Sequence, residues 1–186
     1  MLDGVALELT TLDAWPDVAA PLETGRTFVD NARAKALYYA AASHELTVAE
    51  DSGLEIDALG GAPGVESARY GGERATYADK FALIYDALHA KPTVNWTARF
   101  VCAVALVKSG RLLFETRGTV EGRIAASPAG EGGFGYDPIF FYPPYGCTLG
   151  QVTAEQKAAI SHRGVAFRAL RRYLEASLQT SGFEQV

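Results

Sequence analysis

The sequence predicts an α/β fold, in which strands and helices alternate along the chain. Stretches rich in β-branched and aromatic residues are separated by stretches whose apolar side chains recur every three to four positions. The run from Thr97 to Val107 is apolar on both alternating faces apart from Arg99, which is typical of a sheet strand covered on both sides. These two patterns favour a sheet with helices packed against it.

The N-terminal third predicts a short strand from Val5 to Leu9 and then a helix, FVDNARAKALYYAAAS, which Thr27 caps. The apolar face of that helix would carry Phe28, Ala32, Ala36 and Tyr39. The next segment, LTVAEDSGLEIDALGG, is typical of a strand, a turn and a second strand. Asp51, Ser52 and Gly53 would form the turn, because these residue types favour chain reversals.

The middle of the chain predicts a loop, a helix and a pair of strands. Pro63 would open one helical turn in the loop from Ala62 to Tyr70. A helix from Thr76 to Ala90 follows from the apolar residues on one of its faces, which are Tyr77, Phe81, Ile84, Tyr85 and Leu88. The residues 108–110 supply a tight connection, so the segment from Arg111 to Val120 is expected to pair with the preceding strand.

Two helices are expected near the C-terminus. Thr153 and Gln156 resemble a capping box, and a second helix start lies at Ser161. The apolar stripe of that second helix consists of Ala166, Leu170, Tyr173, Leu174 and Leu178.

Composition limits the classes of protein to which the chain can belong. Its 186 residues fit a single domain, 1–186, or two small lobes with a shared core. The 17 basic residues face 22 acidic ones, which argues against a general nucleic-acid binder. No run has the length of a membrane span and the start has no secretion signal, so a cytoplasmic location is the default expectation. Cys102 and Cys147 have no partner at metal-ligand spacing and are expected to be reduced and structural.

Three segments carry side chains that could bind a metal ion or a ligand, and each also has a purely structural interpretation. Glu50 and Asp51 could hold a divalent cation through carboxylate oxygens, or could form a solvated turn. The motif GGFGYDP, with Phe134 to Asp137 at its centre, could cradle a planar ring, or could be a core-packing loop with one satisfied Asp. The motif SHRG at 161–164, with Lys157 one turn upstream, could bind a phosphate or the polar edge of a base, or could be an ordinary helix cap.

A fourth segment, Glu23-Thr24-Gly25, precedes the first long helix, which also carries Asn31 and Lys35. Acidic residues at this position usually act as caps. Taken together, an acidic pair, an aromatic glycine-rich cradle and a basic helix start suit Mg²⁺-dependent chemistry on a nucleotide polyphosphate.

The same segments resemble the signature blocks of a known family. EDSGLEIDALGGAPGVESARYGG, GGFGYDPIFFYP and QKAAISHRGVAFRAL resemble three blocks of the inosine triphosphate pyrophosphatase (ITPase) family, which acts on noncanonical purine nucleoside triphosphates. ETGRTFVDNARAKA resembles a fourth block. The blocks occur in the order of the family and span nearly the whole chain.

The resemblance implies an ITPase-like fold, with a long mixed central sheet flanked by helices and two lobes around a nucleotide cleft. It also implies hydrolysis of dITP, ITP and XTP to the monophosphate and pyrophosphate, a requirement for Mg²⁺ and a homodimer. In the mechanism so implied, Mg²⁺ bridges carboxylates and phosphates while Asp51 positions or deprotonates the water that attacks the α-phosphorus.

Individual roles follow from the matched motifs. Asp51 corresponds to the catalytic, metal-associated acid, and Glu23 is a further candidate metal ligand. Ser52 corresponds to a residue that contacts the substrate, and Lys35 to a lysine that faces the phosphates. The expected nucleotide-binding residues are Phe134, Gly135, Tyr136, Asp137, Lys157, His162 and Arg163. Phe134 or Tyr136 would stack on the base, and Arg163 would favour an oxygen at purine C6 over an amino group.

The chain departs from the family pattern in three places. Nothing before MLDGVALELTTLD corresponds to the Thr-Gly-Asn loop and first strand, so either the true start lies upstream or the protein is a divergent member. That missing strand would leave ladder groups and apolar surface exposed. Glu50 stands where the family usually has Asp, and Leu22 stands where members often have an acid.

Two other functions remain open from the sequence. One is a nucleotide-binding or dimerising module that kept the base pocket and lost catalysis. The other is a Maf-type nucleotide pyrophosphatase, against which the GFGYDP and SHRG blocks argue.

Overall fold

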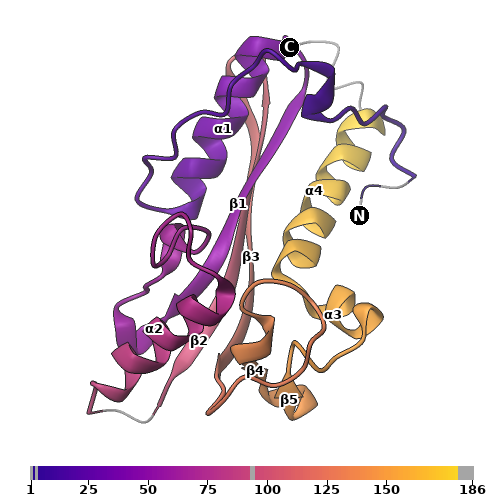
Figure 1. Cartoon of the computed structure of the whole chain (residues 1–186). Coiled ribbons are helices and arrows are strands. Elements are labelled where there is room, and N and C mark those ends of the chain that lie inside the picture. The colour runs from indigo at the N-terminus through magenta and orange to yellow at the C-terminus, as the bar shows by residue number, and fades with distance from the viewer. Residues whose placement is uncertain (1, 3, 93–94, 180–186) are drawn as a thin grey trace. The chain divides into compact units, whose positions relative to one another are not determined.

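The computed structural model describes residues 2, 4–92 and 95–179 (Figure 1). The helices in this part of the chain are α1 (Phe28–Ser43), α2 (Tyr77–His89), α3 (Ala154–Ile160) and α4 (His162–Gln179). The strands are β1 (Thr47–Ile56), β2 (Thr97–Lys108), β3 (Arg111–Ile124), β4 (Phe140–Tyr142) and β5 (Cys147–Thr148). The α/β fold class is therefore confirmed.

The described strands form one antiparallel sheet in the order β1-β2-β3-β4-β5. Ile124 of β3 lies opposite Phe140 of β4, and Tyr142 of β4 lies opposite Cys147 of β5. A mixed sheet also needs a parallel pair, and none occurs among these five strands. No helix within the described ranges is long and apolar enough to cross a membrane.

Local capping explains where three of the helices begin. The hydroxyl of Thr27 accepts a hydrogen bond from the Asp30 backbone N–H at 3.1 Å, and α1 starts at the next residue. Thr76 and Thr153 form full capping boxes at the starts of α2 and α3. The helix starts expected at these three threonines are confirmed.

β1 does not contain the expected turn. It runs unbroken from Thr47 to Ile56, so Asp51 and Ser52 lie in the middle of a strand. Glycine is needed at position 53 because Ser67 packs closely against the backbone there, and not because the chain reverses. A Cβ on Gly53 would lie 2.3 Å from the Ser67 hydroxyl oxygen. That hydroxyl accepts a hydrogen bond from the Leu54 backbone N–H at 2.9 Å. The prediction of a strand, a turn and a strand was therefore wrong.

The predicted strand from Val5 to Leu9 is also wrong. These residues form a bend, in which the Leu7 backbone N–H donates to the Val5 carbonyl at 2.8 Å. The alternating pattern of this segment finds no partner strand among the described residues. Val5 instead packs against an apolar cluster that includes Leu170 and Leu174 of α4.

The contacts divide the chain into two compact units. Unit 1 comprises residues 1–51, 102–118 and 163–186, and unit 2 comprises residues 52–101 and 119–162. Strands β1, β2 and β3 each contribute residues to both units.

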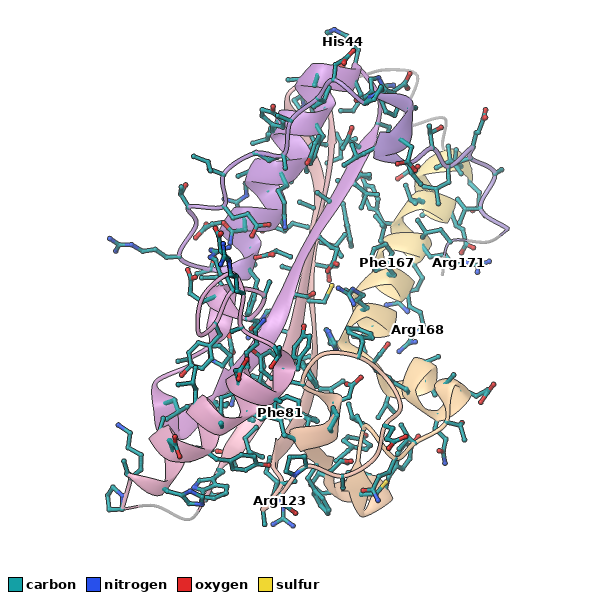
Figure 2. The ribbon with its side chains drawn as sticks, in the orientation of Figure 1. His44, Phe81, Arg123, Phe167, Arg168 and Arg171 are labelled. Atoms are coloured by element: carbon teal, nitrogen blue, oxygen red, sulfur yellow. The ribbon has the colours of Figure 1, made fainter. Side chains whose placement is uncertain are left out.

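The core of unit 1 forms where α4 packs on β2. Its buried members are Cys102, Val104, Leu106, Ala166, Leu170 and Leu174. The helical members recur every four residues, as the predicted apolar stripe requires. Figure 2 shows Arg168 and Arg171 on the opposite side of α4, which faces away from the strands.

Among the described strands, β1 forms one edge of the sheet. A cavity of about 860 Å³ lies beside its first residues, within unit 1. The cavity is lined by Thr47 and Val48, by residues of the N-terminal segment including Trp15, and by Leu170 of α4.

The core of unit 2 forms between α2, the strands and the segment that follows β3. Its buried residues include Leu54, Ile84, Leu88, Phe100, Ile139 and Phe140. Ile84 and Leu88 belong to the face of α2 that the sequence predicts to be apolar. This core anchors the GGFGYDP segment, because Tyr136 is part of it.

Candidate active site

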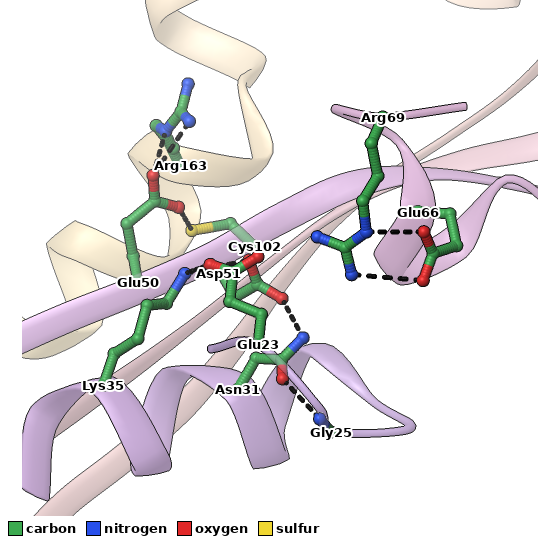
Figure 3. A network of polar contacts seen from close by, with 10 residues as sticks. All are labelled: Glu23, Gly25, Asn31, Lys35, Glu50, Asp51, Glu66, Arg69, Cys102 and Arg163. Carbon is green, nitrogen blue, oxygen red and sulfur yellow. Dashed lines mark hydrogen bonds and ion pairs between the residues drawn. The ribbon is translucent and has the colours of Figure 1, made fainter. Parts of the chain in front are cut away.

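Unit 1 contains a cluster of two carboxylates around one ammonium group, shown in Figure 3. The Nζ atom of Lys35 lies 2.6 Å from Oε1 of Glu23 and 3.0 Å from Oδ1 of Asp51. The second oxygen of Asp51, Oδ2, accepts a hydrogen bond from the side-chain amide of Asn31 at 3.0 Å. Both oxygens of Asp51 therefore have donors, and the structure brings together Asp51 and Glu23, the candidate metal ligands, with Lys35, the candidate phosphate-facing lysine.

The regular elements of unit 1 hold this cluster in place. Asn31 and Lys35 are four residues apart on α1, so they lie one above the other on the same helix face. The Asn31 side chain is 1 % exposed, and its Oδ1 accepts a hydrogen bond from the Gly25 backbone N–H at 2.8 Å. Asn31 thus ties the segment that carries Glu23 to the β1 carboxylate. Sequence reasoning noted Asn31 but gave it no role, although its spacing from Lys35 was a usable signal.

Burial and hydrogen bonding have opposite effects on the pKa of Asp51. Burial raises the pKa of Asp51 and the Glu23 charge adds to this, while hydrogen bonds from Asn31 and Lys35 act in the other direction. For Lys35, burial lowers the pKa, but the hydrogen bonds to Glu23 and Asp51 and their charges raise it overall. The ion pair alone would lower the pKa of Asp51, so desolvation decides the direction there. A carboxylate with a raised pKa is suited to accepting a proton.

The donor set of the cluster fits a magnesium ion. Mg²⁺ prefers oxygen ligands and is commonly held by one or two carboxylates together with substrate phosphates. Glu23 and Asp51 supply two such carboxylates, and both already approach one positive charge, that of Lys35. Within the described ranges no group of three or more His, Cys, Asp or Glu side chains could hold a metal by itself.

Glu50 precedes Asp51 on β1 and contacts different partners. Its Oε1 accepts hydrogen bonds from Nε and Nη2 of Arg163, at 3.0 and 2.8 Å. Its Oε2 accepts a hydrogen bond from the Cys102 thiol, with 3.2 Å between sulfur and oxygen. Glu50 and Asp51, which the sequence offered as joint ligands of a cation or as a solvated turn, thus have different hydrogen-bond partners.

Unit 2 contains a second cluster, built around the GGFGYDP segment. Asp137 is 2 % exposed, and its Oδ2 accepts hydrogen bonds from the Phe134 backbone N–H at 2.6 Å and from Nζ of Lys157. Nζ of Lys157 also lies over the Phe134 ring, 3.7 Å from its centroid. Gly133 has a φ of +73°, and a Cβ there would meet Oδ2 of Asp137. The segment therefore presents Phe134 on a turn braced by a buried carboxylate.

The two aromatic residues of the segment have different environments. Phe134 is 58 % exposed, whereas Tyr136 is 4 % exposed and donates its hydroxyl hydrogen to the Ser67 carbonyl at 2.8 Å. Tyr77 packs edge-on against Tyr136, with 5.4 Å between ring centroids, and burial raises the pKa of Tyr136. Of the two stacking candidates, only Phe134 has an accessible ring.

The remaining expected residues also lie in unit 2. His162 is buried and its ring stacks on Phe100, with centroids 5.0 Å apart and planes inclined by 14°. Ser52 lies half-buried on β1, and Gly135 adopts a positive φ of +66°. Asp51 and Ser52 are consecutive, as are His162 and Arg163, so the division between the units falls inside two predicted site motifs.

The comparisons with known proteins agree with these motifs. The model of the Ham1 family matches residues 1–173. A dITP/XTP pyrophosphatase from Exiguobacterium sp. strain AT1b is 45 % identical over 170 residues, which cover 91 % of this chain and 86 % of the relative. One from Shouchella clausii is 45 % identical over 161 residues, which cover 87 % of this chain and 81 % of the relative.

Solved structures agree in fold as well as in sequence. A Ham1 protein from Staphylococcus aureus superposes with a TM-score of 0.83 and 39 % identity, covering 89 % of this chain and 85 % of that one. A structure from Mycobacterium abscessus, described as a nucleoside-triphosphatase or dITP/XTP pyrophosphatase, has a TM-score of 0.78 and 42 % identity. It covers 90 % of this chain and 86 % of that one. The protein described here therefore belongs to the Ham1 family.

Proposed function

We propose that this protein is a nucleoside triphosphate pyrophosphatase that hydrolyses the noncanonical purine nucleotides dITP, ITP and XTP to the monophosphate and pyrophosphate. The observation that carries the proposal is the 45 % identity to a dITP/XTP pyrophosphatase across 91 % of this chain. The two clusters described above support it, because their side chains suit a triphosphate and a purine base respectively. The proposed role is removal of damaged nucleotides from the pool.

The relatives favour this function over the two alternatives. The first relatives found are named dITP/XTP pyrophosphatases, which supports neither a Maf-type enzyme nor a binding module without catalysis. The cluster of Glu23, Lys35 and Asp51 also supports catalysis, because it contains charged groups that the proposed reaction would use.

Asp51 is the proposed general base. It accepts a proton from a water molecule, and the water oxygen forms a bond to the α-phosphorus. The bond from that phosphorus to the oxygen bridging to the β-phosphate breaks, and its electron pair leaves with pyrophosphate. Lys35 lies next to Asp51 and provides a positive charge for the phosphate oxygens.

Mg²⁺ is the proposed cofactor, with Asp51 and Glu23 as its protein ligands. When bound, the ion would neutralise charge on the phosphate oxygens and on the leaving pyrophosphate. Support comes from the oxygen-only donor set and from the way both carboxylates approach one positive charge.

Phe134 is the proposed stacking platform for the purine base. Its exposed ring is held by the turn around Asp137, and Nζ of Lys157 covers one ring face, so the base would use the other face. Asp137, Lys157 and His162 of unit 2 are further proposed contacts to the nucleotide, and Arg163 of unit 1 is a proposed donor to it. An Arg163 donor favours the C6 oxygen of hypoxanthine and xanthine, because an amino group at that position would leave the donor unsatisfied.

The test is pyrophosphate release from dITP, XTP, dATP and dGTP, with and without Mg²⁺. We expect turnover of dITP and XTP that depends on Mg²⁺, with much slower release from the two standard purines. Tight binding of inosine nucleotides without turnover would instead support the binding module. Preference for pyrimidine nucleotides would support the Maf-type alternative.

Two further expectations come from the family resemblance, a homodimer and a cytoplasmic location. Sedimentation velocity across a range of protein concentrations checks the first. Fractionation of cells that express the tagged full-length protein checks the second.

A further inference from the structure

Glu50 connects the side chains of Arg163, a proposed donor to the base, and of Cys102, which has no role in the proposed reaction. It lies on β1, Cys102 lies on β2 and Arg163 lies in the first turn of α4, and all three belong to unit 1 (Figure 3). One carboxylate oxygen accepts two hydrogen bonds from Arg163, and the other accepts the hydrogen bond from the thiol. Both oxygens of Glu50 are therefore held by donors from other elements of the fold.

Cys102 acts in this arrangement as a donor and not as a nucleophile. The residue is 0 % exposed, and burial followed by the charge of Glu50 raises the pKa of its thiol. The sulfur thus keeps its proton at neutral pH. A thiolate at 3.2 Å from the carboxylate would repel it, whereas the S–H group donates to Oε2.

The hydrogen bonds to Glu50 fix the orientation of the Arg163 guanidinium group. Nε and Nη2 both donate to the same oxygen of Glu50, which takes up one edge of the guanidinium group. The group is planar and rigid, so the position of this edge sets the direction of the Nη1 donors as well. Donor direction matters because hydrogen bonds weaken steeply as they bend.

We propose that Glu50 and Cys102 are positioning residues, which set the direction in which Arg163 presents its other donors to the C6 oxygen of the purine. The proposal rests on the proposed function, in which Arg163 recognises that oxygen. Glu50 determines the orientation of the guanidinium group, and the Cys102 thiol keeps the Glu50 carboxylate from rotating away. Loss of either contact should reduce the preference for dITP over dATP.

The first experiment compares two variants that each remove one charge from an Arg–Glu pair of unit 1. Glu50→Gln loosens the pair with Arg163, and Glu115→Gln loosens the pair of Glu115 with Arg33, which has bonds of 2.9 and 3.1 Å. The measured quantity is kcat/KM for dITP divided by kcat/KM for dATP. We expect this ratio to fall about tenfold in Glu50→Gln and to stay unchanged in Glu115→Gln.

The second experiment separates the donor of Cys102 from its volume. Cys102→Ser keeps a hydroxyl donor, and Cys102→Val has a similar size but no donor. We expect the serine variant to keep the ratio within about twofold of the wild type and the valine variant to lower it about fivefold. Thermal unfolding of each variant is recorded alongside. If either Cys102 variant fails to fold, the comparison of Glu50→Gln with Glu115→Gln decides.

The outcomes distinguish the proposal from a structural role and from failure of the proposed function. A merely structural role would slow dITP and dATP equally, and an unchanged ratio in Glu50→Gln would overturn the proposal. If Arg163→Lys lowers the ratio while Glu50→Gln does not, the proposed function stands and the positioning role falls. If the wild type hydrolyses neither dITP nor XTP, both are wrong.

Discussion

Lys35 occupies the position of a cation between two carboxylates, and this leads to a prediction about metal binding. Its Nζ lies 2.6 Å from Oε1 of Glu23 and 3.0 Å from Oδ1 of Asp51, so a metal ion that coordinates these two oxygens competes with Lys35 for them. Hydrogen bonds between charged groups are worth about 1.5–3 kcal/mol each. Because about 1.4 kcal/mol corresponds to a factor of ten in affinity, loss of one such bond changes the affinity about ten- to a hundredfold.

The perturbation is Lys35→Met, which keeps the length of the side chain and removes its charge. We expect Mn²⁺, titrated calorimetrically in the absence of nucleotide, to bind about ten- to a hundredfold more tightly than to the wild type. Turnover of dITP should fall at the same time, because the lysine charge no longer faces the phosphates.

Arg33→Met is the matched control. Arg33 also lies on α1 and also forms an ion pair, with Glu115, so its loss changes the net charge equally without touching the cluster. We expect its affinity for Mn²⁺ to equal that of the wild type. Equal Mn²⁺ affinities in Lys35→Met and the wild type would refute the reasoning, since Lys35 would then not compete with the metal.

Three further predictions concern single side chains. Asp51→Asn should reduce dITP turnover at least about a thousandfold, because it removes the proton acceptor, while circular dichroism shows an intact fold. Phe134→Leu should raise KM for dITP about tenfold by removing the stacking surface, and an unchanged KM would exclude that role. Asp57 accepts hydrogen bonds from Thr97 and Arg99, and both lower its pKa, Thr97 more than Arg99. These bonds therefore stabilise the fold fully above pH about 3.9, and the stabilisation is lost as the pH falls through the lowered pKa of Asp57. Since Asp57 is exposed, urea unfolding of Asp57→Asn should show a loss of only about 0.5 kcal/mol at pH 7, which disappears in acid.

The helices of this protein could be predicted because their signals are local. Thr27, Thr76 and Thr153 each satisfy a backbone N–H only three residues away, so the sequence window that specifies the cap also contains its partner. The apolar stripe of α4 is equally local, because its spacing alone determines which face is buried.

The two wrong strand predictions have a common cause, because the contacts that decide these segments are distant in sequence. Asp51, Ser52 and Gly53 have the composition of a turn, yet the chain continues as a strand that pairs with β2, and Ser67 packs where a Cβ on Gly53 would lie. The segment from Val5 to Leu9 alternates like a strand, but a strand also needs a neighbour with which to pair. Neither condition can be recognised within the segment itself.

The candidate site shows the same contrast between what the sequence predicts locally and what only the folded chain determines. The sequence by itself determined which residue types are present: the acid of the Asp51 motif, the aromatic glycine-rich segment and the basic helix start, and hence the family. Only the tertiary structure decided that Phe134 is exposed while Tyr136 is buried, and that Glu50 binds Arg163 while Asp51 binds Lys35. The physical reason is that a residue's chemistry is carried by its own side chain. Its burial, orientation and pKa depend on neighbours that only the folded chain brings together.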